Sequence, residues 1–403
     1  LIIINVGPLY GRMQSAIDQV NRCIQENLTA IRVVKSYVRG DYEVEKFGVV
    51  NENLKSESEK AFGTAVLNMP AMQFVMYGTI LGILLIGGRL INEGQMMIGQ
   101  LTSFLSYVLL ILNSLMMMSN VFLLMTRSLA SAERIMEVID EKIDITDENA
   151  KDIAVAKGEI EFDHMWFKYK DTAKEYVLSD VSFHIKPGQT VGIIGQTGSS
   201  KTTLVQLIPR LYDVTKGEVK IDGINVKEYP VRHLRDAVAM VLQKNTLFSG
   251  SLIDNLRWGN ENATLDEIKE ACQIACVDEF VDRLADGYDT EMGQEGVNVS
   301  GGQKQRICIA RAILKKPKVL ILDDSTSAVD TATEAKIRSG LAEKLPDMTK
   351  IIIAQRISSV RHADQIIIMD RGHVEAIGTH ESLLRDNQIY QEIYASQKEG
   401  ADL

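Results

Sequence analysis

The chain has 403 residues and a formal net charge of -10, with an isoelectric point near 5.3. This length allows two or more domains, and the acidic balance argues against a nucleic-acid-binding protein, which usually presents a basic face. The four cysteines, Cys23, Cys272, Cys276 and Cys308, show neither CxxC nor zinc-ligand spacing. We therefore expect packed thiols in a reducing compartment.

The first sixty residues are predicted to be mainly helical. Residues 1–10 are apolar and contain Gly7-Pro8, which fits the end of a kinked membrane helix. Because the chain begins without Met or a basic leader, we interpret it as a fragment whose beginning is missing. Apolar positions three or four apart predict an amphipathic helix over 12–34, then a break at 38–41 and a second, polar helix over 42–60.

Two long uncharged segments follow, over residues 61–88 and 94–126, separated only by residues 89–93. Each exceeds the ~20 residues that a helix needs to cross a bilayer, so we predict a hairpin of two membrane helices. Basic residues flank it on the side that the positive-inside rule makes cytoplasmic: Lys55, Lys60, Arg127 and Arg134. The alternative is a buried helix pair of a soluble protein, in which two such lengths in tandem are uncommon.

Beyond a polar segment over 140–157, which we interpret as a linker, the apolar pattern changes to strands. Period-two alternation predicts an antiparallel sheet from residues around 160–162, 181–185 and 219–221. Continuous apolar runs predict buried parallel strands over 319–322, 351–354 and 366–369. Strands that alternate with helices indicate an α/β core.

Residues 191–203 read VGIIGQTGSSKTT, a buried strand, a Gly/Ser loop and the start of a helix. Such a turn cradles phosphates with backbone N–H groups, while Lys201 reaches the outer phosphates and the Thr202 hydroxyl can hold Mg²⁺. The full pattern G-x-x-x-x-G-K-[ST] has glycine where this chain has Ser200, and a Cβ there narrows the allowed backbone. The alternative is a plain Gly/Ser turn. The predicted ATP contacts are Gly195, Gln196, Thr197, Gly198, Ser199, Ser200, Lys201, Thr202 and Thr203.

A second motif, VSGGQKQR over residues 299–306, precedes the apolar run that ends in Asp323-Asp324. Ser300 and Gln303 are spaced as a capping box at a helix start. The two glycines between them would let a phosphate approach the exposed N–H groups. The predicted ATP contacts here are Ser300, Gly301, Gly302 and Gln303.

Taken together, these motifs resemble those of ATP-binding cassette exporters that fuse a membrane region to a nucleotide-binding domain, and the resemblance covers nearly the whole chain. It implies a partial α-helical transmembrane domain over 1–139, with the end of the fourth membrane helix, a coupling region around 36–45, and the fifth and sixth membrane helices. It further implies a linker over 140–157 and, over 158–403, an α/β P-loop ATPase domain with antiparallel β and helical subdomains. The expected location is the cytoplasmic membrane, multi-pass, with the nucleotide-binding domain in the cytoplasm.

The same resemblance implies roles for individual residues. Tyr169 would stack on adenine, and the segment 327–330, which ends in Asp330, would cross to a partner domain. Asp323 would hold Mg²⁺ together with Thr202 and the loop glutamine Gln243, which would also contact the membrane domain. The residues expected to act in catalysis are Asp324, Gln355 and Gln243.

In this family ATP and Mg²⁺ are sandwiched between the phosphate cradle of one subunit and the Ser-Gly-Gly-Gln helix of the other. ATP binding therefore closes a dimer, and hydrolysis reopens it and moves the membrane helices. The implied partners are a second half-transporter, the lipid bilayer, and a small-molecule, lipid or peptide substrate, with no nucleic acid.

Three positions depart from the family pattern. Asp324 stands where active members carry a glutamate, Gln355 replaces the switch histidine, and Ser200 replaces a glycine. We therefore expect the degenerate, slowly hydrolysing half of a heterodimer, whose intact Ser-Gly-Gly-Gln helix serves its partner. The alternatives are a homodimeric exporter with an active site, a soluble cassette ATPase, and an ATP-gated regulatory or channel subunit.

Overall fold

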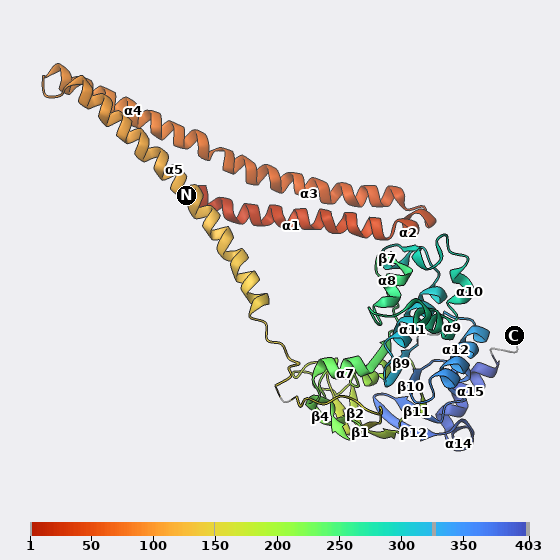
Figure 1. Cartoon of the computed structure of the whole chain (residues 1–403). Helices are drawn as coiled ribbons and strands as arrows, with labels where there is room; N and C mark the ends of the chain where they lie inside the picture. The colour runs from red at the N-terminus through yellow and green to blue at the C-terminus, as the bar shows by residue number, and fades with distance from the viewer. Residues whose placement is uncertain (1, 149, 325–327, 400–403) are drawn as a thin grey trace. The chain divides into compact units, whose positions relative to one another are not determined.

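The computed structural model describes residues 2–148, 150–324 and 328–399. The chain divides into two compact units, residues 1–141 and residues 142–403 (Figure 1). The first unit is all helical, whereas the second contains the sheets.

The first unit begins with a long helix that packs along another. Helix α1 (Ile2–Thr29) lies against α3 (Gly40–Val66), and the short helix α2 (Ile31–Ser36) stands between them. The predicted break is confirmed, with Val38 at φ +53°. The predicted first helix is interrupted at Ala30, which lies in neither α1 nor α2.

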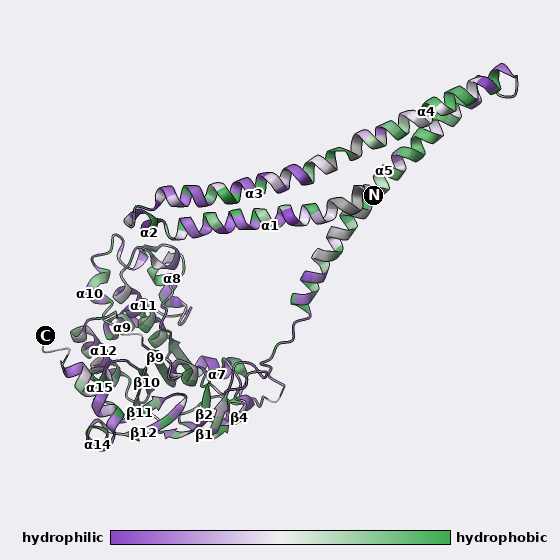
Figure 2. Ribbon diagram, turned by 180° about the vertical axis from the view of Figure 1, so that it is seen from behind, coloured by the Kyte–Doolittle hydropathy of each residue, from purple (hydrophilic) through white to green (hydrophobic). Residues whose placement is uncertain are grey.

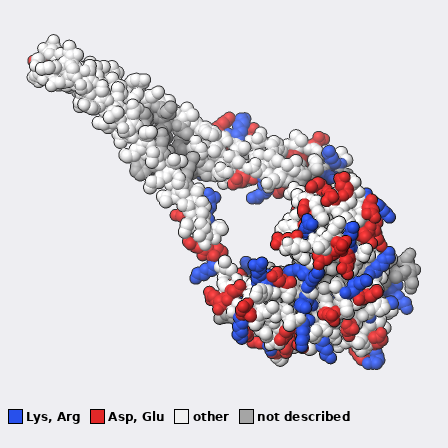
Figure 3. Space-filling view, viewed as in Figure 1, with Lys and Arg blue, Asp and Glu red and all other residues white. Residues whose placement is uncertain are grey.

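Helices α4 (Asn68–Asn92) and α5 (Ile98–Ile139) form the predicted hairpin. Spans of 20 and 18 residues within them, Gln73–Asn92 and Ile98–Leu115, are long and apolar enough to cross a membrane. Both helices are mostly hydrophobic along the hairpin, and few charged side chains appear on the face in view (Figures 2 and 3). Their apolar side chains point largely outward, as expected for contact with lipid or with other membrane helices.

The second unit starts with the antiparallel sheet that the alternating pattern predicts. Its order is β2-β1-β4-β5, built from β1 (Ile160–Phe167), β2 (Leu178–Ile185), β4 (Lys216–Ile221) and β5 (Ile224–Asn225). The alternate residues that face the core, such as Ile160, Phe162 and Val181, are buried.

The second sheet has six strands in the order β12-β11-β3-β10-β9-β6. The strands β11, β3, β10, β9 and β6 run parallel, and only β12 pairs antiparallel with its neighbour. This confirms the buried parallel strands predicted from the apolar runs. The strands are β3 (Thr190–Ile194), β6 (Val238–Val241), β9 (Val319–Asp323), β10 (Thr349–Ile353), β11 (Gln365–Asp370) and β12 (His373–Gly378).

Helices cover this sheet and form a helical subdomain, and one apolar cluster joins these helices to one face of the sheet. Here lie Cys272, Cys276 and Cys308, which are buried thiols, as is Cys23 in the first unit. Burial raises the pKa of Cys272 to about 12, so the thiol stays protonated. The helices are α6 (Lys201–Gln206), α7 (Val231–Ala237), α8 (Leu252–Arg257), α9 (Leu265–Ile274), α10 (Asp278–Val281), α11 (Gly301–Leu314), α12 (Thr331–Lys344), α13 (Ile357–Val360), α14 (His380–Asp386) and α15 (Gln388–Glu399), with a short pair of strands, β7 (Gly250–Ser251) and β8 (Glu291–Met292).

The start of the second unit is fastened by one carboxylate. The described residues between Asp140 and Lys157 form neither helix nor strand. Asp222, in the turn between β4 and β5, accepts hydrogen bonds of 2.7–2.9 Å from four successive backbone N–H groups, those of residues 156–159. The chain is therefore anchored where β1 begins.

Candidate nucleotide-binding site

The loop between β3 and α6 is shaped by its glycines. A Cβ on Gly195 would lie 2.1 Å from the carbonyl oxygen of Met369, so no other residue fits there. Gly198 has φ +86°, the left-handed region in which glycine is unstrained. The loop can therefore fold tightly above the carboxyl end of β3.

Ser200, the residue just before α6, takes φ +69° and ψ 22°. This is the left-handed conformation that costs an L-residue roughly 1–2 kcal/mol. The backbone thus keeps the shape that the motif's glycine would provide, and the serine holds it under strain.

The side chain of Lys201 lies within the loop. Its Nζ donates to the carbonyl oxygens of Gly195 and Gln196, both at 2.8 Å, and to Ser199 Oγ at 3.1 Å. Burial lowers the pKa of Lys201, while the charges of Asp324 and Asp323 act to raise it. An ammonium held beside several backbone N–H groups can contact a bound phosphate chain.

Asp323 ends β9 and is 2% exposed. Its Oδ1 accepts a hydrogen bond of 3.1 Å from the hydroxyl of Thr202, and burial raises its pKa. Among the described residues no group of three or more His, Cys, Asp or Glu could hold a metal ion. Mg²⁺ at nucleotide sites needs only one or two protein oxygens beside phosphate and water, so this hydroxyl and carboxylate fit that ion.

Asp324 lies at the centre of a small polar cluster. Its backbone is left-handed, with φ +47°. Its Oδ2 accepts a hydrogen bond of 2.8 Å from Gln355 Nε2 and a longer one of 3.4 Å from Gln243 Nε2. Burial raises the pKa of Asp324, and the hydrogen bond from Gln355 opposes that shift.

These groups line a cavity of about 300 Å³ at the carboxyl ends of the parallel strands. Ligands of open α/β sheets bind at this edge. Ile353, which the sequence motifs do not mark, also lines it. The lining residues are Thr197, Gly198, Ser200, Lys201, Thr202, Thr203, Gln243, Asp323, Asp324, Ile353 and Gln355.

Tyr169 lies beside this cavity without lining it. Its hydroxyl forms a hydrogen bond of 2.9 Å with Thr203 Oγ1, and its ring meets those of Phe167 and Tyr212 edge-on. The residue is 50% exposed, which leaves ring surface available for stacking.

The second motif has the predicted local structure but lies outside the cavity. Ser300 caps α11, with its Oγ accepting from Gln303 N and Gln303 Oε1 accepting from Ser300 N. Ser300 and Gly301 are exposed. Because none of these residues lines the cavity, the chain presents the two halves of a nucleotide site separately.

Asp330 caps helix α12, because its side chain accepts a hydrogen bond of 3.0 Å from Thr333 N. This contact holds its pKa below the usual range. Ser327, at the start of the predicted crossing segment, lies outside the described residues.

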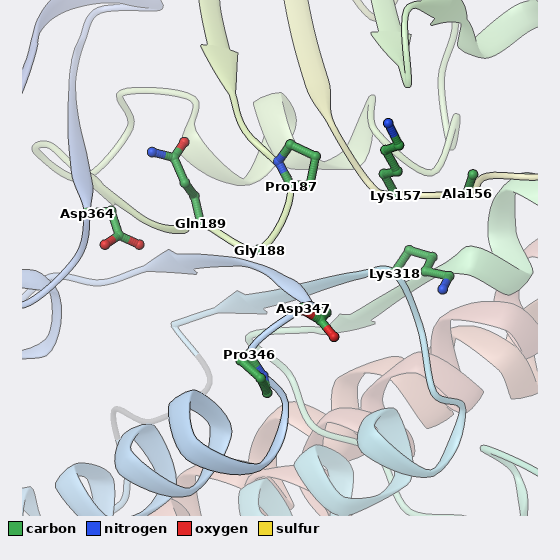
Figure 4. Close-up of a pocket in the computed structure, with 9 residues that line it drawn as sticks. All are labelled: Ala156, Lys157, Pro187, Gly188, Gln189, Lys318, Pro346, Asp347 and Asp364. Atoms are coloured by element: carbon green, nitrogen blue, oxygen red, sulfur yellow. The ribbon is translucent and has the colours of Figure 1, made fainter.

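A larger hollow, of about 550 Å³, lies at the opposite edge of the same sheet (Figure 4). Gln189, Lys318 and Asp364 stand just before strands β3, β9 and β11. Asp364 accepts a hydrogen bond from Thr190 N, and Gln189 accepts one from Lys186 N. These polar groups stabilise turns, and this edge is not where such sheets bind ligands.

The fold and the cradle define a phosphate-loop ATPase joined to a helical membrane region. Comparison with known proteins identifies the family. The family described as ABC transporter matches residues 178–327, and the ABC transporter transmembrane region matches residues 6–115.

Known relatives match nearly the whole length of this chain. An uncharacterized ABC transporter ATP-binding protein of Bacillus subtilis, YfiB, is 41% identical over 398 residues, which is 98% of this chain and 69% of that protein. The putative multidrug export ATP-binding/permease protein YgaD of the same organism is 36% identical over 407 residues, again 98% of this chain and 69% of that protein. The structure of a bacterial Atm1-family ABC exporter with ATP bound is similar with a TM-score of 0.88 at 28% identity, over 98% of this chain and 70% of that one.

The chain therefore belongs to the ABC transporter family, with an exporter-type membrane region followed by an ATP-binding domain. This membership supports ATP hydrolysis coupled to transport, and places the protein in the membrane with its nucleotide-binding domain in the cytoplasm. The match to the membrane region excludes the alternative of a soluble cassette ATPase.

Proposed function

We propose that this chain is the low-turnover half of a heterodimeric ABC exporter. Its cradle binds ATP with Mg²⁺ and hydrolyses it slowly, while its own Ser300–Gln303 segment completes a faster site on a different half-transporter. The observation that carries the proposal is the contact between Asp324 and Gln355, at 2.8 Å, where active members of the family have a glutamate and a histidine.

In this proposal the loop 195–200 binds the phosphates with backbone N–H groups, Lys201 and Thr203 contact them from α6, and Tyr169 stacks on adenine. Asp330 belongs to the segment that meets the partner.

The metal site consists of Thr202 and Asp323, with Gln243 beside them. When Mg²⁺ is bound, it neutralises phosphate charge that develops as the terminal phosphoryl group is transferred. The distance of 3.1 Å between the Thr202 hydroxyl and the Asp323 carboxylate supports their sharing one ion.

Hydrolysis requires a water molecule whose oxygen bonds to the terminal phosphorus while the bond from phosphorus to the bridging oxygen breaks. The water must also release a proton to an acceptor. Asp324 is one methylene shorter than glutamate, which retracts its carboxylate by roughly 1.5 Å. Misplacement on that scale can cost about a hundredfold in rate.

Gln355 adds a second defect. Its amide is neutral and cannot exchange a proton as a histidine does. It also donates to Asp324 Oδ2, which in addition accepts from Gln243 Nε2. Slow turnover follows from both residues together.

The transported substrate is proposed only as a class. The name of the relative YgaD, a putative multidrug export protein, supports a small-molecule, lipid or peptide substrate that leaves the cell. The proposed partner is a second half-transporter that carries the glutamate and the histidine.

The test is the double variant Asp324→Glu/Gln355→His in the full-length protein. We expect single-turnover hydrolysis at this site to rise by about tenfold to a hundredfold, with ATP binding unchanged. Asp324→Asn/Gln355→His is the matched control, because it supplies the histidine without a carboxylate. An unaltered rate in a double variant that still binds ATP would contradict the proposal.

A further inference from the structure

The C-terminal helix α15 contacts the backbone at Gln355 and Ile357 through the side chain of Gln397. Gln397 Nε2 donates to the carbonyl oxygen of Gln355 at 2.8 Å, and Gln397 Oε1 accepts from Ile357 N at 2.8 Å. One amide thus spans the two backbone groups on either side of Arg356. This orientation of the amide satisfies both contacts. In the flipped orientation its NH₂ group would face the Ile357 N–H and its oxygen would face the Gln355 carbonyl oxygen.

The segment that Gln397 contacts is held at both ends by other bonds, from Ala354 N to Ile193 O and from Arg361 N to Ile357 O. Strand β10 ends at Ile353 and α13 begins at Ile357, so residues 354–356 lie between regular elements. Gln355 and Arg356 are exposed. The Gln355 carbonyl and the Ile357 N–H lie between these bonds and are paired by the Gln397 amide, as backbone groups outside regular elements must be.

Helix α15 is itself well anchored, so it can hold this segment. Tyr390 is fully buried and its hydroxyl forms a hydrogen bond of 2.7 Å with His380 Nδ1. Gln391 Nε2 donates to the carbonyl oxygens of Leu384 and Arg385 at 2.9 and 3.1 Å. These contacts fix α15 against α14 and the core, and thereby fix the position of Gln397.

We propose that Gln397 is a positioning residue for hydrolysis, which holds the backbone of residues 355–357 so that the side chain of residue 355 reaches residue 324. The proposal rests on the proposed function for the catalytic relevance of Gln355. Because the contacts are to backbone, Gln397 acts in the same way whether glutamine or histidine occupies position 355. The C-terminal helix α15 thus contributes to the rate of ATP hydrolysis.

Two substitutions separate the contacts. Gln397→Met keeps the length of the side chain and loses both hydrogen bonds. Gln397→Glu keeps the acceptor for Ile357 N but turns the donor toward Gln355 into an acceptor. Gln391→Met is the matched control, since it removes a glutamine of the same helix that holds α14 instead of the 355–357 segment.

The first measurement is amide hydrogen exchange of the full-length protein without nucleotide. In Gln397→Met we expect exchange at Ile357 to accelerate by about tenfold, the factor expected for one net hydrogen bond. Gln397→Glu should keep most of that protection, and Gln391→Met should leave it unchanged. Equal exchange in Gln397→Met and the parent protein would overturn the proposal, irrespective of how the site hydrolyses ATP.

The second measurement is ATP hydrolysis, made in both the parent chain and the Asp324→Glu/Gln355→His background. We expect Gln397→Met to lower kcat by about tenfold or more and to leave KM for ATP unchanged, because Gln397 does not line the cradle. A similar loss in Gln391→Met, or a change in KM alone, would show a general effect of helix packing and would overturn the positioning role.

Discussion

Ser200 shows how one Cβ can alter a phosphate cradle without removing it. The residue stands at φ +69° in a position where the family pattern has glycine. Its N–H remains part of the loop, so ATP binding is expected to survive. The serine at position 200 adds backbone strain and crowding, whereas Asp324 and Gln355 replace the groups that act in hydrolysis.

Ser200→Gly should therefore stabilise the protein. Relief of the left-handed strain gives roughly 1–2 kcal/mol, and the greater freedom of glycine in the unfolded chain offsets about 0.4–1 kcal/mol of it. We expect a net gain near 0.5–1 kcal/mol by thermal denaturation, and tighter ATP binding because the phosphate can approach closer.

Arg371→Gly is the control for this prediction. Arg371 also has positive φ, at +43°, but lies in the turn between β11 and β12, and its side chain does not line the cradle. The Arg371→Gly variant should gain stability without a change in its affinity for ATP. Unchanged stability in Ser200→Gly would mean that the loop relaxes to another conformation.

For single residues, the sequence predicts which ones form the phosphate loop but not which ones support the site. Lys201 and Thr202 follow from the spacing of the phosphate-loop motif, because local backbone geometry fixes where their side chains point, whereas the role of Asp323 follows from the family resemblance. Gln397 carries no such signal, since a single glutamine in a polar helix is unremarkable. Its contact with residue 355 arises only from tertiary packing.

At the scale of elements, the connection between the linker and strand β1 depends on Asp222. Its two oxygens accept from four backbone N–H groups of residues 156–159. Hydrogen bonds to a charged acceptor are stronger than those between neutral groups. The start of the ATPase domain is therefore anchored by charge-assisted hydrogen bonds in addition to the burial of Val155 and Ile160.

Asp222→Asn would turn one acceptor oxygen into a donor that faces backbone N–H groups. We expect it to lower the free energy of unfolding by about 1–3 kcal/mol, measured by thermal denaturation of the full-length protein. Asp180→Asn is the control, because Asp180 has a similar backbone, φ +50°, but an exposed side chain paired with His164. Equal effects of the two substitutions would contradict the anchoring role.

Strands and long helices were predictable because burial imposes a period on the sequence. The alternation that placed β1, β2 and β4, and the apolar runs that placed β9, β10 and β11, agree with the structure. The interruption at Ala30 was missed because apolar spacing continues through it. Periodicity reports the buried face of a helix and not the continuity of its hydrogen bonds.

For the whole molecule, the cradle and the Ser300 helix of one chain do not meet at one cavity, so the chain can supply them only to two different ATP sites. The cavity contains Lys201 and Asp323, while Ser300 is exposed and lies outside it. A head-to-tail pair of subunits uses both surfaces, because each gives its cradle to one site and its Ser300 helix to the other. In the proposed heterodimer these two sites differ in rate.

This difference predicts unequal effects of two substitutions in the assembled transporter. Lys201→Ala disables only the slow site of this chain, so most steady-state hydrolysis should remain. Ser300→Ala removes a contact from the fast site of the partner, so hydrolysis should fall by about tenfold or more, as for loss of a group that stabilises transition-state charge.

The control is Thr264→Ala, which removes an equivalent cap from α9 and should cost a similar ~1 kcal/mol of stability while sparing hydrolysis. The assay is steady-state ATP hydrolysis by the complex purified from membranes in which this chain assembles. In a homodimer every site contains both Lys201 and Ser300, so Lys201→Ala would strongly lower hydrolysis as well. Only unequal sites make Ser300→Ala the more damaging change.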